Sequence, residues 1–497
     1  MNKYIKKGLI LTGCTIGLFM GHACTDLEEE VYDQTTPDSF GQTPGQLNAL
    51  IGPLYSGLGD YYGNMAEINT VTDEQIVPTR GGDWEDGGRW RRFHQHTWDV
   101  TLDDGTFNGI WNWIYNNITR INFQLADENL TNEQTIAELR TLRAFYHYIA
   151  TDMFGNVIIA DRVGGDSPAQ KTRTEVYTWV EQELVAAIPN LSEETGGVNY
   201  GRMNKYVAHM ILGKLYLNAQ VYTGTPQWAK VIEQMDAIIN SNKYSLPADF
   251  FSTFAVQNQN SPEIILATPM DATKRGGFNP HMRTLHYLNQ TTYNLGAAPW
   301  NGFATMAEFY NSYEDTDQRK DGWIVGQQFN AKGEPLVDDG QPLIFSPEIP
   351  ALVMPAGPAA RRAGARFKKY EIQVNNKNND QSNDFVIFRL ADALLMRAEA
   401  QFRLGNTAAA LTDINRVRER AYGANYVALT TITLDEILAE RGRELAWEFH
   451  RRQDLIRFDK FTQAWQFKPA SAETRELYPI PRTQLDLNPN LSQNPGY

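Results

Sequence analysis

The stretch that decides the fold lies in the C-terminal third of the chain and reads DFVIFRLADALLMRAEAQFRLGNTAAALTDINRVRER, residues 384–420. Its apolar residues recur at the spacing of an amphipathic helix, and Leu404-Gly405 interrupts them with a turn. The helical pattern continues to about residue 458. We therefore predict a helical block over residues 384–458 and a mostly α-helical fold class.

Two segments have the spacing of tetratricopeptide helix pairs, which would act as a scaffold. In the stretch above, Ala398, Ala410 and Ile414 occupy the small, small and bulky positions of that repeat. In the other segment, Leu212-Gly213 and Tyr216 fit the first helix, but Ala229 comes about four residues late. We expect an expanded turn there. This pair belongs to a first helical block, residues 105–241, with predicted helices at Phe107–Ala126, Asn132–Phe154, Thr174–Ile188 and Arg202–Tyr222.

The segment between the two blocks, residues 252–383, is rich in Gly, Pro and Asn and has only short apolar runs. Strands are predicted at Glu263–Ala267 and Leu343–Phe345. We interpret this segment as an irregular, loop-rich lobe with short strands. A helix is also expected near residues 44–58. With no flexible linker in the sequence, residues 36–497 are predicted to form a single domain.

The N-terminus has the pattern of a secretion signal, with Lys3, Lys6 and Lys7 before a short apolar stretch. The only two cysteines are Cys14 and Cys24. Leu11 to Cys14 matches a lipobox better, but cleavage there leaves too short an apolar core, so we predict a signal at residues 1–23 and lipidation of Cys24. An ordinary signal remains the alternative. Residues 24–35 then form an acidic tether, and the folded body has no disulfide.

Charge and motifs exclude several classes of function. The net charge of −14 becomes −17 without the signal, because residues 1–23 contain three lysines and no acids. Nucleic acid and anionic lipid are therefore poor partners. No nucleophile elbow, zinc-binding HExxH helix or phosphate-binding loop is present. His94 and His96 lack a third ligand, and Asp103-Asp104-Gly105 lacks the spacing of a calcium loop. We expect no cofactor and no obligatory metal.

The clearest functional signal is aromatic. Trp84 and Trp90 lie in a glycine-rich loop, residues 78–90, and a second aromatic loop runs from His286 to Asn301. An exposed Trp offers a flat apolar face to a pyranose ring, while neighbouring polar groups bind the hydroxyls. Trp111 and Trp113 follow helical spacing and are predicted to be core.

A set of ordered motifs links the chain to a known family. Besides residues 384–420, the set contains ERGRELAWEFHRRQDL (440–455), YPIP (478–481) and QNPGY (493–497). Upstream it contains RTLRAFYHY (140–148) followed by FGNV (154–157). This pattern resembles the SusD/RagB family. Glu440, Glu444 and Glu448 within it are predicted to form ion pairs with nearby arginines along one helix face that packs on a neighbour.

The resemblance implies a fold of four tetratricopeptide-like units with a more irregular lobe, carried on the outer membrane by a lipid anchor. It also implies glycan capture at the cell exterior and delivery to a SusC-like TonB-dependent transporter, with no bond broken. Family glycan sites point to Trp84, Tyr287, Tyr293 and Trp300, and our predicted set adds Asp83, Trp90 and Asn301. The alternatives are an exported glycoside hydrolase, a protein-binding scaffold, or aromatics that pack the lobe interface or the transporter.

Overall fold

The structure is a computed structural model that describes residues 43–164 and 167–497. The predicted signal, the tether, Cys14 and Cys24 lie outside these residues. Within the described ranges, no helix is both long enough and apolar enough to cross a membrane.

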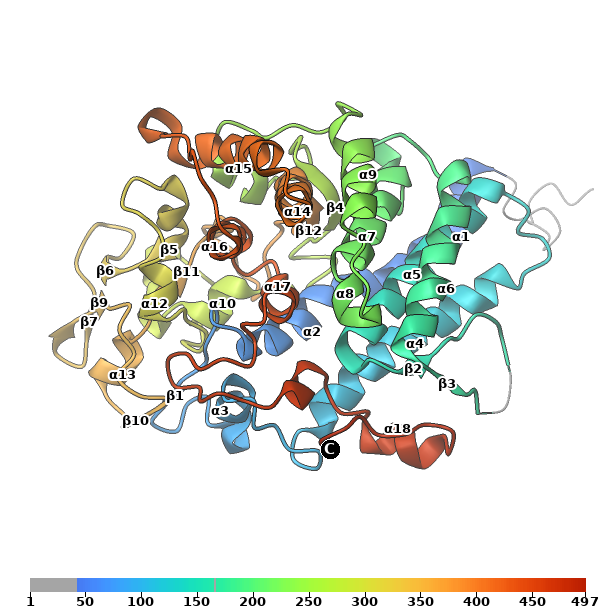
Figure 1. The fold of residues 1–497 in the computed structure, drawn as a ribbon. Coiled ribbons are helices and arrows are strands. Elements are labelled where there is room, and N and C mark those ends of the chain that lie inside the picture. The colour runs from blue at the N-terminus through green and yellow to red at the C-terminus, as the bar shows by residue number, and fades with distance from the viewer. Residues whose placement is uncertain (1–42, 165–166) are drawn as a thin grey trace, which may run out of the picture.

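Helices make up most of the N-terminal half: α1 (Pro44–Tyr55), α2 (Tyr61–Ile68), α4 (Asp104–Leu125), α5 (Glu133–Phe154), α6 (Arg173–Ala187), α7 (Lys205–Leu217), α8 (Ala219–Thr223) and α9 (Trp228–Ile239). Among them, α4 packs on α5, α5 on α6, and α7 on α9 (Figure 1). Helix α4 forms because its apolar side chains, among them Ile110, Ile114 and Ile118, recur on one face and are buried. A capping box of Thr172 and Glu175 starts α6. The short α8 supplies the expanded turn predicted between α7 and α9.

The C-terminal helices complete the scaffold, with α14 (Leu390–Arg403) packed on both α15 (Thr407–Tyr422) and α9. Gly405 has a φ of 84° in the turn between α14 and α15, a conformation that favours glycine. The remaining helices here are α16 (Leu434–Leu445), α17 (Arg451–Arg457) and α18 (Arg482–Leu487). The mostly α-helical class is confirmed. The block differs from the prediction at its start, because Phe385–Arg389 is strand β12, buried on both faces.

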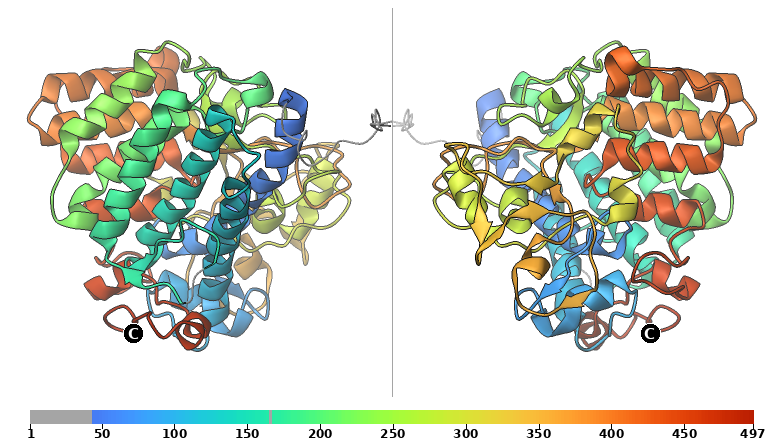
Figure 2. Two further views of the ribbon diagram at one scale, coloured as in Figure 1. Left: turned by 90° about the vertical axis from the view of Figure 1, so that its right-hand side faces the viewer. Right: turned by 90° about the vertical axis from the view of Figure 1, so that its left-hand side faces the viewer.

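The irregular lobe lies on the side of the scaffold away from α6 (Figure 2). Its longest strand, β4 (Ile264–Thr268), pairs antiparallel with β12 and joins the lobe to the helices. Its short helices are α10 (Pro280–Thr284), α11 (Gln290–Tyr293), α12 (Ala307–Tyr310) and α13 (Pro358–Arg362). The other strands are two-residue pairs: β5 (Trp323–Ile324) with β11 (Arg366–Phe367), β6 (Gly326–Gln327) with β9 (Ile344–Phe345), and β7 (Val337–Asp338) with β8 (Gln341–Pro342).

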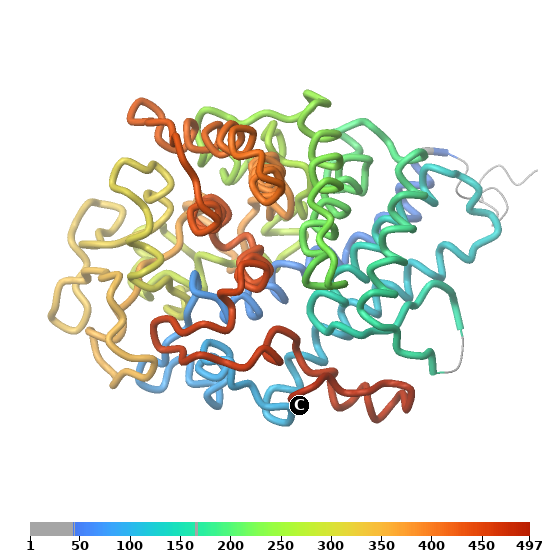
Figure 3. Tube along the Cα trace, in the orientation of Figure 1, coloured from blue at the N-terminus to red at the C-terminus, as the bar shows by residue number. Residues whose placement is uncertain are grey.

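Two further pairs involve segments outside the lobe. Strands β2 (Val157–Ile158) and β3 (Gln170–Lys171) pair beside α5 and α6. Strand β1 (Thr79–Arg80) runs parallel to β10 (Val353–Met354), which brings the glycine-rich loop against the lobe. The tube in Figure 3 shows this early segment beside chain from far later in the sequence. After β1 the chain enters α3 (Arg89–His94).

Glu440 and Glu444 of α16, together with Glu448 just beyond its end, form a buried network rather than the predicted pairs along one helix. Only Glu440 has a partner on its own helix, Arg443 at 2.7 Å. Glu444 binds Arg319 at 2.8 Å and Arg389 at 2.6 Å, both from other elements. Burial alone raises the pKa of Glu440, but the surrounding arginines lower it to about 2. The glutamate face does pack on its neighbours, as predicted, and it does so through ion pairs with arginines of other elements.

Candidate functional site

The two aromatic loops predicted from the sequence meet in the structure, and Arg80 holds them together. Arg80 is buried, and its guanidinium donates hydrogen bonds to backbone carbonyls. Nε donates to Ala360 at 3.0 Å, Nη1 to Gly302 at 3.0 Å and Nη2 to Ala363 at 2.8 Å. Guanidinium groups suit this task because their donors form a rigid planar fork. The first loop, the second loop and α13 are therefore fixed to one another.

Trp84 is half-buried and held in one orientation by the second loop. Its Nε1 donates to the carbonyl of Trp300 at 2.7 Å, and its ring stands edge-on to Phe303 at 5.5 Å. The indole lies on the backbone of Gly302, where a Cβ would come within 2.2 Å of the ring. Only glycine fits at that position. The ring is thus a fixed platform with part of its surface open.

Tyr287 and Trp300 complete the rim beside Trp84, and both are partly exposed. The Tyr287 hydroxyl donates to the carboxylate of Asp83, which is itself exposed. Burial and this hydrogen bond raise the pKa of Tyr287 to about 12, so the hydroxyl keeps its proton at neutral pH. We call Asp83, Trp84, Tyr287 and Trp300 the aromatic rim.

Three residues of the predicted glycan-binding set lie away from the rim's open surface. Trp90 is only 3% exposed; its Nε1 donates to Asp86 at 2.5 Å, and Arg89 lies over its ring. In this arrangement Trp90 packs and offers no face to a sugar. Asn301 is fully buried with a φ of 53°, so it shapes the loop. Tyr293 lies in a separate pocket with Phe251.

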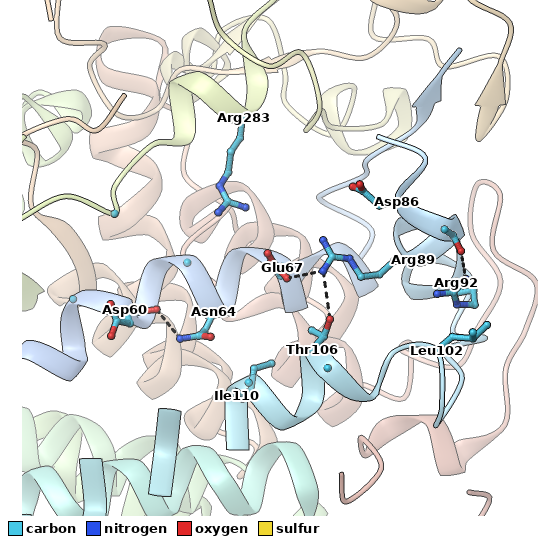
Figure 4. A pocket seen from close by; sticks show the side chains of 16 residues that line it. Asp60, Asn64, Glu67, Asp86, Arg89, Arg92, Leu102, Thr106, Ile110 and Arg283 are labelled. Carbon is cyan, nitrogen blue, oxygen red and sulfur yellow. Dashed lines mark hydrogen bonds and ion pairs between the residues drawn. The ribbon is translucent and has the colours of Figure 1, made fainter. Parts of the chain in front are cut away.

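Next to the rim is a groove of about 850 Å³, shown from close by in Figure 4. Helix α2 contributes Asn64 and Glu67, with Asp60 just before it, and α10 contributes Arg283, which reaches toward α2. Asp86 and Arg89 come from the glycine-rich loop and the start of α3. The Arg283 guanidinium also lies 5.3 Å from the Phe303 ring on which Trp84 packs. The buried Phe303 ring thus connects Arg283 of the groove with Trp84 of the rim.

Glycines leave the groove open along two helices. A Cβ added at Gly63 in α2, or at Gly105 or Gly109 in α4, would meet no atom within 4 Å. Glycine inside a helix typically costs about 1 kcal/mol relative to alanine. Bare backbone at these positions lets a ligand approach closely, which is one reason for glycine to occur there. The groove was not predicted from the sequence, and these helical glycines are the signal that could have indicated it.

The charges of the groove are largely balanced by neighbours. Arg89 lies 3.4 Å from Glu67, and Asp60 lies 3.2 Å from Arg275. Arg283 donates from Nε to Asn279 at 2.9 Å and has no carboxylate partner within the described ranges. The groove thus offers both donors and acceptors close to an apolar rim. Such a surface suits a neutral, hydroxyl-rich ligand.

The histidines weighed as metal ligands have structural roles. His94 Nε2 lies 2.8 Å from the carbonyl of Gln466, and His96 Nε2 lies 2.8 Å from that of Val71. Burial is the largest cause that lowers the pKa of His94, to about 4, so its ring is neutral at pH 7. No group of three or more metal-ligating side chains occurs in residues 43–164 and 167–497.

Comparisons with known proteins agree on one family. A family model described as "Starch-binding associating with outer membrane" matches residues 32–217, and one described as "SusD family" matches residues 358–470. The starch-binding protein SusD from Bacteroides thetaiotaomicron is 28% identical over 78% of this chain and 78% of its own length. SusD-like protein P2 from Formosa agariphila is 23% identical and covers 100% of both chains.

Solved structures share the fold. Surface glycan-binding protein A from Bacteroides thetaiotaomicron, in complex with laminarihexaose, superposes with a TM-score of 0.73 at 19% identity. The match covers 91% of this chain and 99% of that one. At this identity the similarity concerns the arrangement of helices and lobe.

Proposed function

Because this chain belongs to the SusD/RagB family, we propose that it is a surface glycan-binding protein that captures an oligosaccharide or polysaccharide and delivers it to a SusC-like TonB-dependent transporter. It is a binding protein and not an enzyme, in keeping with relatives named for starch and glycan binding.

The observation that carries the proposal is the groove of about 850 Å³ with its aromatic rim. A sugar has an apolar C–H face and a ring of hydroxyls, so it needs a flat apolar surface beside mixed donors and acceptors. Trp84 supplies a fixed surface of the first kind, and Asn64 and Arg283 supply groups of the second kind. The volume lies in the range of ligand pockets, roughly 300–1,000 Å³.

Location and partner follow from the family and from the N-terminal sequence. We propose that Cys24 carries a lipid, that residues 24–35 form an acidic tether, and that residues 36–497 form one domain on the outside of the outer membrane. The description of one matching family model refers to association with the outer membrane. Replacement of Cys24 with Ser is expected to release the protein from membranes, whereas release by Cys14→Ser instead would contradict this assignment.

Affinity electrophoresis in polysaccharide gels tests the proposed capture. The purified protein is expected to be retarded by at least one polysaccharide chosen from a glycan-array screen and to release no reducing ends from it. Release of reducing ends would favour the glycoside hydrolase. Normal migration in every gel would favour a protein-binding scaffold, in which the aromatic rim faces the transporter.

A further inference from the structure

A second pocket, of about 420 Å³, lies around Tyr293 at the end of α11. Its lining also includes Phe251, Asp321, Lys368, Glu371 and Ile372, and it shares no lining residue with the groove. Tyr293 was predicted to act together with Trp84. In the structure it is part of this separate hollow, formed where the loop after α11 meets residues 321 and 368–372.

Two aromatic rings form the apolar part of this pocket, and both are partly exposed. Phe251 packs edge-on against Phe250 at 5.1 Å, and one edge of its ring would lie 3.5 Å from a Cβ added at Gly322. The ring is therefore held by a neighbour on one side and by backbone on another. The backbone carbonyl of Tyr293 accepts from the amide of Asn375 at 2.9 Å, which anchors the main chain that carries the second ring.

The polar side chains around these rings are free to bind a ligand. Asp321 and Lys368 are exposed, and within the described chain their side chains have no hydrogen-bond or ion-pair partner. The Tyr293 hydroxyl likewise makes no hydrogen bond there, and burial raises the pKa of Tyr293 to about 12, so it remains a donor. Glu371 uses one carboxylate oxygen on the amide of Val256, at 2.8 Å. Donors and acceptors thus surround an apolar surface.

We propose that this pocket is a second carbohydrate site, one that takes a short segment or branch of the same glycan. The inference rests on the proposed function. Its chemistry repeats that of the first site: aromatic surface for the C–H face of a sugar, and a phenol, an ammonium group and carboxylates for its hydroxyls. A purely apolar ligand would form no hydrogen bond or ion pair with the side chains of Asp321 and Lys368. Its volume is about half that of the groove, which suits fewer sugar residues.

Two sites on one molecule increase the affinity for a long chain that reaches both, because the second contact becomes intramolecular. Loss of the Tyr293 pocket should therefore weaken polysaccharide binding and leave a short oligosaccharide bound in the groove. Loss of the groove should leave weak binding at the Tyr293 pocket. The two sites can thus be separated by variants.

The test is affinity electrophoresis on the polysaccharide that retards the wild type, with four variants of the full exported chain and a fifth as the control. Tyr293→Ala is expected to bind the polysaccharide at least about a hundredfold more weakly, at the low end of avidity effects. Asp321→Ala, an exposed change, is expected to weaken binding in the same direction. Gly109→Leu, which places a bulky side chain in the groove, is expected to keep weak retardation, and the double variant Gly109→Leu/Tyr293→Ala to lose it. Phe123→Ala changes an aromatic side chain that is 61% exposed and outside both pockets, and is the control.

The outcomes separate this inference from the proposed function. If Tyr293→Ala and Asp321→Ala migrate like the wild type while Gly109→Leu alone abolishes retardation, the groove is sufficient and the second site is overturned. If the wild type is not retarded by any polysaccharide, both the proposed function and the second site are overturned. If a short oligosaccharide raises the melting temperature of Gly109→Leu but not that of Gly109→Leu/Tyr293→Ala, the second site is supported.

Discussion

At the scale of single residues, tryptophans that look alike in the sequence have different roles. Trp84 stays half-open because Gly302 and the carbonyl of Trp300 support it from one side. Trp90, six positions later, is covered by Arg89 and bound to Asp86. The glycines around the loop predicted exposure for both. The partners that distinguish Trp84 are Trp300 and Gly302, more than 200 positions away, so local composition could not separate the two tryptophans.

Trp111 was predicted to be core from its helical spacing, and this is confirmed. It is 2% exposed and packs against Tyr115 at 4.7 Å and Phe154 at 5.2 Å. Trp111→Ala is expected to lower the free energy of unfolding by about 3–5 kcal/mol, because it removes a buried ring and leaves a cavity. Urea denaturation measures this. Phe123→Ala, on the same helix, is expected to change stability by no more than about 0.5 kcal/mol; equal losses in the two variants would contradict the assignment.

At the scale of elements, the helical spacing of apolar residues predicted the boundaries of the long helices to within a few residues. Predicted Asn132–Phe154 corresponds to α5 at Glu133–Phe154, and Thr174–Ile188 corresponds to α6 at Arg173–Ala187. Strand β12 was predicted as helix, because a short apolar run buried on both faces has no alternation to reveal it. The groove was not predicted at all. Its walls come from residues 59–67, 86–92, 102–110 and 277–283, which only the tertiary fold brings together.

The network on α16 joins elements that are distant in sequence, and Glu444 is at its centre. Its carboxylate accepts from Arg319, Arg389 and Arg420. Glu444→Gln keeps the size and shape of the side chain but removes its negative charge, so the three buried arginines lose a counter-charge. We expect a loss of about 3–5 kcal/mol in the free energy of unfolding, as is typical when one partner of a buried ion pair is removed.

Glu419→Gln on α15 is the matched control, because Glu419 is exposed. It is expected to change stability by no more than about 0.5 kcal/mol. Chemical denaturation of both variants at pH 7 makes the comparison. A Glu444→Gln variant as stable as Glu419→Gln would show that the buried pairs do not support the packing of α16.

At the scale of the whole molecule, buried histidines make stability depend on pH. All seven histidines in the described ranges have a lowered pKa, and burial is the largest cause for each; His94, His147, His286 and His450 are lowered to about 4. Unfolding restores a pKa near the ordinary histidine value of 6.5. Between these values the unfolded chain binds more protons than the native one, so stability falls as the pH decreases from about 6.5 to about 4.

Carboxyls whose pKa is raised by burial oppose this trend, and the shift is large for Glu74. Burial raises the pKa of Glu74 to about 8, so its contribution to stability is lost as the pH rises from about 4.5 to 8. Seven histidines outweigh it. Each net proton taken up on unfolding changes stability by about 1.4 kcal/mol per pH unit. Urea midpoints at pH 7, 6 and 5 are expected to decrease in that order with an unchanged m value. A midpoint that is constant or higher at pH 5 would contradict the burial of these histidines.

The central claim is that the groove beside the aromatic rim binds the glycan, and Gly109→Leu tests it most directly. Residue 109 lies on α4, and a Cβ added there meets no atom within 4 Å, so a leucine projects into the groove and improves helix propensity by up to about 1 kcal/mol. Gly52→Leu is the matched control, on α1 and also without neighbours within 4 Å, but outside the groove.

The measurement is calorimetric titration of both variants and the wild type with a short oligosaccharide from the polysaccharide that retards the wild type. Gly109→Leu is expected to lose the wild-type binding isotherm while melting at or above the wild-type temperature, and Gly52→Leu is expected to bind normally. If Gly109→Leu binds with wild-type affinity, the glycan does not occupy the groove and the account is contradicted.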